Sequence, residues 1–276
     1  MRVITSPGDR RLPEAAALLK SSAKTVALTG AGISVGSGIP DFRSAGGLWS
    51  VFSPDEYATL EVFLRNPKKA WKLYRALGNT LLGKRYNPAH RSLAELEGAG
   101  LLAGIVTQNI DNLHQQAGST TVLEIHGDHR HLQCLQCGHL EPVQDVHYVD
   151  GDVPRCPACS SYLKPNIVLF GEAVRKLEEI ETLIDGCEVL LVIGTSAQVY
   201  PAAALPMAVK ERGGTVFEFN REQALGGSRF AGISTITDWF FEGDVVDTLP
   251  MLLEALAAGS PNPGAGPGFS GAEDDE

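Results

Sequence analysis

The stretch KTVALTGAGIS, residues 24–34, decides the fold of this chain. Residues 24–29 are dense in β-branched and apolar side chains, which is typical of a buried strand, and this strand ends abruptly at Gly30-Ala31-Gly32. Similar segments recur along the chain, with helical stretches between several of them: residues 101–107, 122–125, 189–193 and 215–219. Because strands that alternate with helices pair in parallel, the sequence predicts a doubly wound α/β sheet.

Length and composition exclude several classes of protein. The 276 residues suffice for one large domain, or for one domain with a smaller insertion. Apolar residues make up 43% and charged residues 20%, so collagen-like, coiled-coil and wholly disordered chains are excluded. No apolar run approaches the roughly 20 residues of a membrane span, and residues 1–11 lack the apolar stretch of a secretory signal. We therefore expect a cytoplasmic protein with no membrane segment.

The charge of the chain is strongly negative. The formal net charge is −10, and four of the acidic residues occupy positions 273–276. Such a chain is a poor general nucleic-acid binder. Residues 259–276 consist almost entirely of small, proline and acidic residues with little to bury, and we expect this tail to be disordered.

Two segments interrupt the alternation of strands and helices and are predicted to be insertions. The first, about residues 42–96, is helical in pattern. Pro67 can occupy the first position of a helix whose apolar face comprises Trp71, Leu73, Tyr74, Leu77 and Leu81. The second insertion, about residues 127–164, carries most of the cysteines.

The cysteines indicate a metal site. Four of the five form two CxxC pairs, Cys134 with Cys137 and Cys156 with Cys159. Two such turns complete a tetrahedral thiolate site, for which zinc is the usual metal, and four sulfur ligands leave no position for water. One structural zinc is therefore predicted, the alternative being four unrelated buried thiols. Only Arg155 and Lys164 bring positive charge near the second pair, which disfavours sequence-specific nucleic-acid recognition by a zinc ribbon.

The glycine-rich stretch at residues 30–38 points to a dinucleotide. Missing Cβ atoms let a backbone approach a pyrophosphate, and a following helix attracts the anion. The usual GxGxxG fingerprint requires a glycine where Val35 stands, and a glycine-rich structural turn is the alternative. Just downstream, Asp41, Phe42 and Arg43 either position a nucleotide or serve as a helix cap and core.

Short segments rich in polar side chains follow four of the predicted strands, where ligands bind in open α/β sheets. These residues are Gln108, Asn109, Ile110 and Asp111, then His126, then Gly194, Thr195 and Ser196, and finally Asn220. Imidazole titrates near neutral pH, so His126 is a candidate general base, although a lone histidine is more often a surface or core residue.

These pieces together resemble the sirtuin family of NAD-dependent protein lysine deacylases. The resemblance rests on GAGIS at 30–34, SGIPDFRS at 37–44, TQNIDNLH at 107–114, HG at 126–127, the CxxC pairs, KPNIVLFGE at 164–172, GTS at 194–196 and VYPAA at 199–203. These motifs follow the order of the family and extend over about residues 10–257.

The resemblance implies a catalytic domain over residues 10–258. Its Rossmann-like core would comprise about residues 10–41, 97–126 and 165–258, and its smaller domain would join a helical module, about 42–96, to a zinc ribbon, about 127–164. NAD is implied as a consumed co-substrate: the acyl group of a lysine moves to ADP-ribose, and nicotinamide and free lysine are released. Acyl-lysine proteins or peptides are the implied partners.

The resemblance also implies roles for individual residues. His126 is the implied base, and Asn109 orients a hydroxyl or water. The implied NAD site comprises Gly30, Ala31, Gly32, Ile33, Asp41, Phe42, Arg43, Gln108, Asn109, Ile110, Asp111, His126, Gly194, Thr195, Ser196, Asn220, Arg221, Glu222 and Val245. The implied substrate site comprises Tyr74, Val168, Phe170, Gly171, Glu172 and Val199.

One departure from the family pattern concerns the acyl group. Family members that remove succinyl or malonyl groups carry Tyr-x-x-Arg on the helix that lines the acyl pocket, whereas here Tyr74 is followed at that spacing by Leu77. An acyl carboxylate without a guanidinium would cost several kcal/mol in an apolar pocket. We therefore expect a neutral acyl group. ADP-ribosyl transfer or NAD hydrolysis, and binding without turnover, stay open as alternatives.

Overall fold

A parallel sheet forms the larger part of the molecule. The computed structural model describes residues 1–41, 47–149, 151–226 and 235–258. Within these residues the main sheet has seven parallel strands: β1 (Arg2–Ile4), β10 (Trp239–Glu242), β9 (Thr215–Asn220), β8 (Val189–Ile193), β2 (Thr25–Thr29), β3 (Gly104–Thr107) and β4 (Val122–Glu124), in this spatial order. Apart from β1, this order has the double winding of a Rossmann sheet, with β2 at the switch point. The predicted α/β fold is confirmed.

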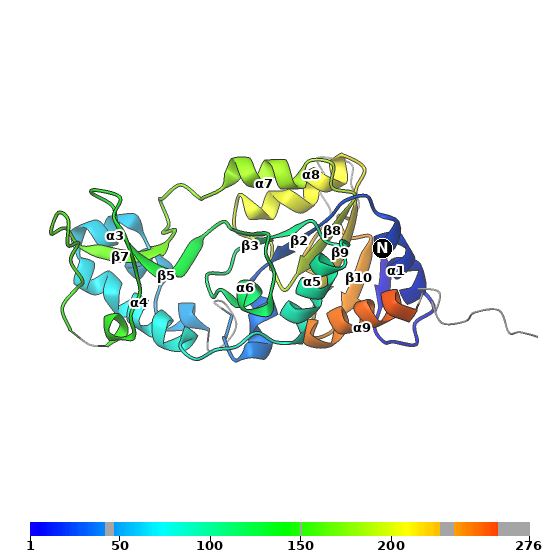
Figure 1. The fold of residues 1–276 in the computed structure, drawn as a ribbon, viewed down its shortest axis with the longest axis horizontal. Coiled ribbons are helices and arrows are strands. Elements are labelled where there is room, and N and C mark those ends of the chain that lie inside the picture. The colour runs from blue at the N-terminus through cyan, green and yellow to red at the C-terminus, as the bar shows by residue number, and fades with distance from the viewer. Residues whose placement is uncertain (42–46, 150, 227–234, 259–276) are drawn as a thin grey trace, which may run out of the picture.

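Helices cover both faces of the main sheet (Figure 1). One face carries α7 (Leu177–Ile184) and α8 (Leu205–Glu211), and the other carries α1 (Leu12–Ser21), α5 (Pro88–Gly98) and α9 (Val245–Ala258). The short helix α6 (Leu113–Ala117) follows β3 and packs against α5. The central strand β8 is buried along its whole length because alternate side chains enter the two cores.

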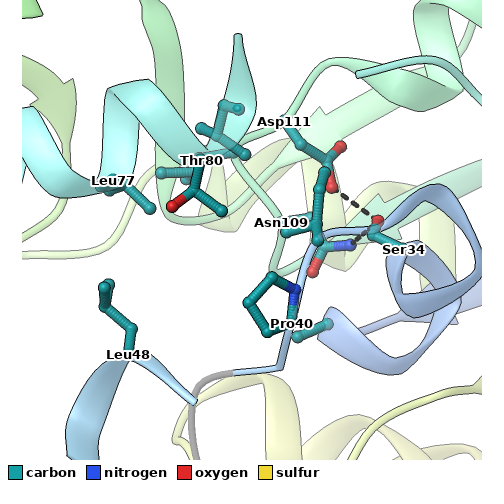
Figure 2. Close-up of a pocket in the computed structure, with 11 residues that line it drawn as sticks. Ser34, Pro40, Leu48, Leu77, Thr80, Asn109 and Asp111 are labelled. Atoms are coloured by element: carbon teal, nitrogen blue, oxygen red, sulfur yellow. Dashed lines mark hydrogen bonds between the residues drawn. The ribbon is translucent and has the colours of Figure 1, made fainter. Parts of the chain in front are cut away.

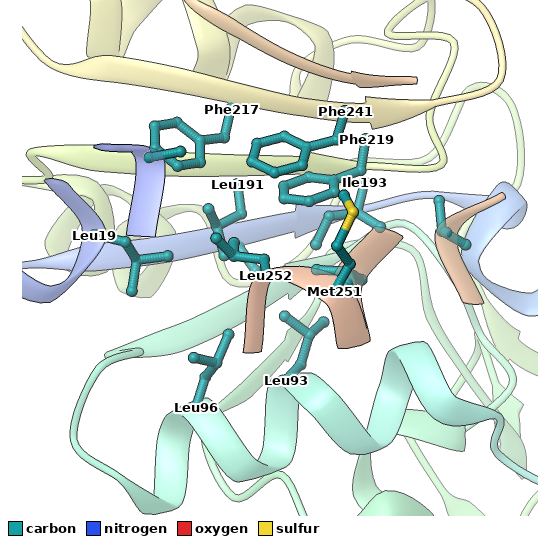
Figure 3. Packing of buried hydrophobic residues seen from close by; sticks show 14 of the residues in the cluster. Leu19, Leu93, Leu96, Leu191, Ile193, Phe217, Phe219, Phe241, Met251 and Leu252 are labelled. Atoms are coloured by element: carbon teal, nitrogen blue, oxygen red, sulfur yellow. The ribbon is translucent and has the colours of Figure 1, made fainter. Parts of the chain in front are cut away.

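Aromatic rings fill the core between the sheet and α9 (Figure 3). Phe219 of β9 stacks on Phe241 of β10 with ring centroids 4.2 Å apart. Met251 and Leu252 of α9 belong to the same cluster, and Leu93 of α5 lies beyond them. The helix α9 is therefore sandwiched between the sheet and α5.

Two parts of the sheet differ from the sequence-based prediction. The strand predicted at 101–107 begins only at Gly104, because the N–H of Leu101 donates to the carbonyl of Leu96 and the preceding residues form the turn after α5. The strands β1 and β10 were not predicted. They pair with each other at one edge of the sheet, and β1 has only three residues, too few to show a pattern.

A smaller lobe lies at one end of the molecule (Figure 1). It contains α2 (Pro54–Tyr57), α3 (Leu60–Arg65) and α4 (Pro67–Leu81), and an antiparallel sheet of β6 (Leu140–Pro142), β5 (Gly127–Cys134) and β7 (Leu163–Ile167). The helix predicted from Pro67 is confirmed as α4, and the side chain of Asn66 caps it by accepting from the N–H of Lys69 at 3.1 Å.

The helices and the small sheet of this lobe share one core. The indole Nε1 of Trp71 donates to the carbonyl of Leu163 at 2.8 Å, and the guanidinium of Arg75 donates to the carbonyl of Val149 at 2.8 Å. The ring of Tyr148 packs against Gly78 of α4. The two predicted insertions therefore fold against each other.

The exact division into domains stays a prediction. The helix α5, which falls within the predicted helical insertion at 42–96, packs its buried face into the core of the main sheet beside α9. The predicted tail, residues 259–276, lies outside the described residues. None of the described helices combines the length and the apolar character that crossing a membrane requires.

Gly78→Ala should destabilise the protein. A Cβ atom at this position would lie 2.2 Å from a ring carbon of Tyr148. Alanine in a helix is favoured over glycine by about 1 kcal/mol, but overpacking costs about 1–3 kcal/mol, so we expect a net loss of stability in thermal or urea unfolding. Gly98→Ala is the matched control, because a Cβ at Gly98 in α5 meets nothing within 4 Å. Equal stability of the two variants would contradict this reading of the interface.

Candidate functional site

The polar residues predicted at strand ends lie at one edge of the main sheet. Parallel strands place their carboxyl ends together, and the turns that follow β2, β3, β8 and β9 are joined by hydrogen bonds. Gln108 Nε2 donates to Thr195 Oγ1 at 2.9 Å, and Asn220 Nδ2 donates to the carbonyl of Thr195 at 3.1 Å. Asn109 Nδ2 donates to the carbonyl of Gly30 at 3.1 Å. The structure thus brings these segments into one site.

The glycine turn packs directly against the turn after β8. The N–H of Gly32 donates to the carbonyl of Gly194 at 2.8 Å, and a Cβ atom on Gly32 would lie 2.7 Å from the Cα of Gly194. A Cβ on Gly30 would lie 2.7 Å from the Cβ of Thr195. Both glycines are therefore needed for the contact between the two turns, which the sequence did not reveal. The chain continues as the 3₁₀ helix Ala31–Ser37.

A buried polar cluster lies beside this turn (Figure 2). Ser34 Oγ donates to Asp111 Oδ2 at 2.6 Å, and Asn109 Nδ2 donates to Ser34 Oγ at 3.1 Å. His90 Nε2 lies 3.5 Å from the same hydroxyl, and burial lowers the pKa of His90 to about 4, so the ring is neutral at pH 7. Neither Ser34 nor His90 was among the residues predicted to form the site. Ser34 follows the glycine turn directly, but nothing in the sequence connects His90 to it.

A pocket opens between this cluster and the small lobe (Figure 2). Its polar wall is formed by Ser34, Asn109 and Asp111, and its apolar wall by residues of α4 and neighbouring segments. The other lining residues, which are apolar except for Thr80, are Ala31, Ile39, Pro40, Leu48, Leu77, Thr80, Leu81 and Ile110. The pocket is therefore suited to a ligand with one polar and one apolar part.

His126 follows β4 and is mostly buried. Its Nδ1 lies 2.9 Å from the carbonyl oxygen of Gln108. Because a carbonyl oxygen can only accept, this contact places the proton of the neutral ring on Nδ1 and leaves a lone pair on Nε2. Burial lowers the pKa of His126 below its usual value, and the hydrogen bond to Gln108 partly opposes that effect. The ring therefore has the form that a general base requires.

The segment 168–172 connects the two lobes beside His126. The N–H of Val168 donates to the carbonyl of His126 at 2.8 Å. The N–H of Phe170 donates to the carbonyl of Ala58, and the carbonyl of Phe170 accepts from the N–H of Leu60, both at 3.0 Å. The ring of Phe170 is half exposed. Four of the residues predicted to bind substrate thus lie on one strip of backbone that runs between the lobes: Val168, Phe170, Gly171 and Glu172.

Four other predicted site residues lie either in a hydrophobic core or at the surface. Tyr74 is fully buried in the small lobe against Trp71, and it is not among the residues that line the pocket. Val245 is buried in the main core. Arg221 pairs with Asp244 at 2.7 Å on the surface, where Glu222 is exposed.

The flank of the glycine turn is only partly described. Asp41 is partly exposed and is the last described residue before a gap at 42–46. Phe42 and Arg43 lie outside the described residues. Ile33 is buried beneath the turn. Ser196 and Val199 continue the chain after β8, and the carbonyl of Val199 accepts from the N–H of Ala203 at 3.0 Å.

The four cysteines converge at the tip of the small sheet. The Sγ atoms of Cys134, Cys137, Cys156 and Cys159 all lie within 4.8 Å of one another. Each CxxC turn is closed by a backbone hydrogen bond, from Gly138 to Cys134 at 3.0 Å and from Ser160 to Cys156 at 2.8 Å. A tetrahedral zinc with bonds of about 2.3 Å requires sulfurs about 3.8 Å apart, which this cluster satisfies with little movement. The residues therefore fit one structural zinc ion.

Comparisons with known proteins agree with this geometry. The model of the Sir2 family matches residues 30–201. The NAD-dependent protein deacylase of Pyrococcus abyssi is 41% identical over 249 residues, which cover 88% of this chain and 97% of that protein. The enzyme of the same name from Thermococcus kodakarensis is 42% identical over 252 residues, covering 89% and 95%.

Solved structures show the same fold. A complex of a Sir2 homologue with NAD has a TM-score of 0.80 at 35% identity and covers 92% of this chain and 96% of that one. A complex of Sir2 with a p53 peptide and NAD⁺ has a TM-score of 0.77 at 35% identity, covering 89% and 98%.

The purified protein should contain one zinc ion per chain. Cys137→Ser removes one of four sulfur ligands, so we expect loss of most of the zinc and a lower melting temperature. Elemental analysis by mass spectrometry measures the metal. Cys187→Ser is the matched control, because Cys187 lies in the main core, where its thiol donates to the carbonyl of Val189. A full zinc content in Cys137→Ser would show that the cluster is not the metal site.

Proposed function

Because this chain belongs to the Sir2 family, we propose that it is an NAD-dependent protein lysine deacylase acting on neutral acyl groups. The observation that carries the proposal is the state of His126. Its Nδ1 proton is held by the carbonyl of Gln108, which leaves Nε2 as a base, and Gln108 directly precedes Asn109 on the loop that forms the polar wall of the pocket. A base that is hydrogen-bonded to the loop of the polar wall suits transfer of an acyl group to a sugar hydroxyl.

The residues at the sheet edge would hold NAD. NAD supplies the ADP-ribose that accepts the acyl group, and nicotinamide leaves. We assign the turns at 30–33 and 194–196, with Asn220, to its adenosine and phosphate half. Asn109 and Asp111, which Ser34 joins by hydrogen bonds, are assigned to the ribose and nicotinamide half. The contact of the two turns at the carboxyl edge supports this assignment, because nucleotides bind at this edge of Rossmann sheets.

His126 would act on a ribose hydroxyl. Nicotinamide would leave when the acyl oxygen of the lysine bonds to the nicotinamide ribose in its place. Nε2 of His126 would then take the proton of a neighbouring ribose hydroxyl, whose oxygen would bond to the acyl carbon, and water would complete the release of free lysine and O-acyl-ADP-ribose. This role requires a neutral ring, which burial favours by lowering the pKa of His126. Asn109, fixed by its bonds to Gly30 and Ser34, would orient the hydroxyl or a water.

The segment 168–172 would bind the acyl-lysine peptide as an added strand. The N–H groups of Val168, Leu169, Phe170 and Glu172 all donate within the protein. The carbonyls of Leu169 and Phe170 also accept within the protein, so a peptide that pairs with this segment would use the backbone groups that these bonds leave available. Such pairing reads backbone rather than side chains, so sequence preference should be modest.

The pocket favours an uncharged acyl group. Leu77 lines it, and the lining residues that the structure describes include the carboxylate of Asp111 but no lysine or arginine. A succinyl or malonyl carboxylate placed against Leu77 would meet no cation among the described lining residues, and burying it unpaired would cost free energy. Acetyl and longer aliphatic groups carry no such penalty.

Other expectations stay predictions from the sequence. These are the cytoplasmic location, the absence of sequence-specific nucleic-acid binding, the domain boundaries, and contacts of NAD with Phe42, Arg43, Arg221, Glu222 and Val245.

Incubation with NAD and an acetyl-lysine peptide should yield free peptide, nicotinamide and O-acetyl-ADP-ribose, as measured by mass spectrometry. His126→Ala should lower the rate at least about 100-fold, because the base is lost. The same peptide carrying succinyl-lysine is the matched substrate and should react more slowly. Nicotinamide release without deacylation by the wild-type protein would favour NAD hydrolysis or ADP-ribosyl transfer, and faster desuccinylation would contradict the neutral-acyl assignment.

The pH dependence should also report His126. Because burial lowers the pKa of His126 below 6.5, the neutral base persists at pH 6.5 and is lost only as pH falls through the lowered value. We therefore expect the acidic decline of kcat/KM to have its midpoint below pH 6.5. The His126→Ala variant should lack this decline. A midpoint above pH 6.5 would contradict the assignment.

A further inference from the structure

Lys164 is the only fully buried lysine or arginine among the described residues. It lies on β7, one residue after Leu163, which pairs with Cys134 of the zinc cluster and accepts the indole hydrogen bond of Trp71. The chain leaves β7 at Ile167 and continues directly into the segment 168–172. Lys164 therefore stands between the zinc-bearing sheet and the proposed peptide-binding segment.

The ammonium group of Lys164 is enclosed by the last residues of β7 and by Glu172 of the segment 168–172. Its Nζ lies 3.0 Å from Oε2 of Glu172 and donates to the carbonyls of Ile167 at 2.6 Å and Pro165 at 3.3 Å. The same Glu172 oxygen accepts from the N–H of Leu169 at 2.9 Å. An ammonium has three donors, and all three are used within residues 164–172. Residues 165–172 thus supply all the hydrogen-bond partners of one buried charge.

This charge also affects the surroundings of Tyr74 in the core of the same small lobe. Burial and the carboxylate of Glu172 both raise the pKa of Tyr74, whose hydroxyl has no hydrogen-bond partner among the described residues. Without Lys164, the carboxylate of Glu172 would face this apolar core unpaired. The pair therefore fixes the direction of Glu172 as well as the path of the backbone.

Stability alone does not account for a buried cation. Replacing a buried ion pair by apolar residues of similar volume is often neutral or stabilising, whereas a pair with directed hydrogen bonds can specify one conformation. Here the directed bonds join two carbonyls of β7, those of Pro165 and Ile167, to the carboxylate of Glu172 in the segment that follows. The adjoining Val168 and Phe170 are then held against His126 and Ala58 by their own N–H groups.

We infer that Lys164 is a positioning residue for the acyl-lysine substrate: it fixes the segment 168–172 in the shape that binds the peptide. The inference rests on the proposed function, which assigns the peptide to this segment. Lys164 is fully buried, so it acts on the peptide through Glu172 and the backbone. Its removal should weaken peptide binding while leaving the NAD end of the site and the zinc cluster intact.

The experiment compares Lys164→Met with the wild type in two binding assays. Fluorescence anisotropy with a labelled acetyl-lysine peptide should show affinity lowered about 10- to 100-fold, because a displaced segment loses its pairing geometry. Calorimetry with NAD should show a change below about twofold, because its site lies at the edge of the other sheet. Lys164→Arg, which keeps the charge, should restore most of the peptide affinity.

Hydrogen exchange gives an independent readout that needs no ligand. In Lys164→Met the amides of Val168, Leu169 and Phe170 should exchange faster, whereas those of β8 should not change. Lys210→Met is the matched control, because it removes a lysine paired with Asp238 at the distant end of the main sheet. If Lys164→Met does not fold, Lys164→Gln, which stays polar but uncharged, takes its place in every assay.

The outcomes separate the two hypotheses. Unchanged peptide affinity and unchanged exchange in a folded Lys164 variant would overturn the inference and leave the proposed function intact. Equal losses of peptide affinity, NAD affinity and zinc would assign Lys164 to general stability and would also overturn it. A wild-type protein that binds no acetyl-lysine peptide with NAD present would refute the proposed function, and the exchange data would still decide whether Lys164 orders the segment.

Discussion

The site depends on the backbone contact between two turns, one after β2 and one after β8. Gly30 and Gly32 must lack a Cβ for this contact to form, because either atom would meet Thr195 or Gly194 at 2.7 Å. Each later element is joined to this pair of turns: Asn109 through the carbonyl of Gly30, and Gln108 and Asn220 through Thr195. His126 then takes its tautomer from the carbonyl of Gln108. A steric constraint on glycine thus determines the orientation of the catalytic edge.

The small lobe is held together by contacts between its two sequence-distant halves rather than by either half alone. Trp71 of α4 donates to the backbone of β7, and the ring of Tyr148 fills the space that Gly78 leaves. The cysteine cluster closes the far end of the small sheet, and the segment 168–172 returns from its other end to the main sheet. The segment beside His126 is therefore continuous with the strand that pairs with the cysteine-bearing β5 and that packs on α4.

The sequence revealed those features that local pattern encodes. Buried parallel strands are continuous apolar runs, so residues 24–29 and 189–193 were predictable, and the CxxC spacing encodes its own metal site. The family resemblance, now confirmed, and the strand-end rule led to Asn109 and His126. Ser34, His90 and the Lys164–Glu172 pair were not assigned these partners, because their hydrogen bonds form only between segments that the tertiary fold brings together. The packing of Tyr148 against Gly78 could not be predicted for the same reason.

Burial lowers the pKa of each basic group around this site, but the protonation states that result differ. The imidazoles of His126 and His90 are desolvated with no strong ion pair, so their pKa values fall and both rings stay neutral. Burial also lowers the pKa of Lys164, but the carboxylate of Glu172 opposes this shift, and three acceptors stabilise the charged form. The same loss of water thus yields a neutral base on one side of the segment 168–172 and a retained charge on the other. His126 and Lys164 therefore serve different purposes. A base such as His126 must have a nitrogen free to accept a proton, whereas a positioning charge such as Lys164 must have all its donors in hydrogen bonds.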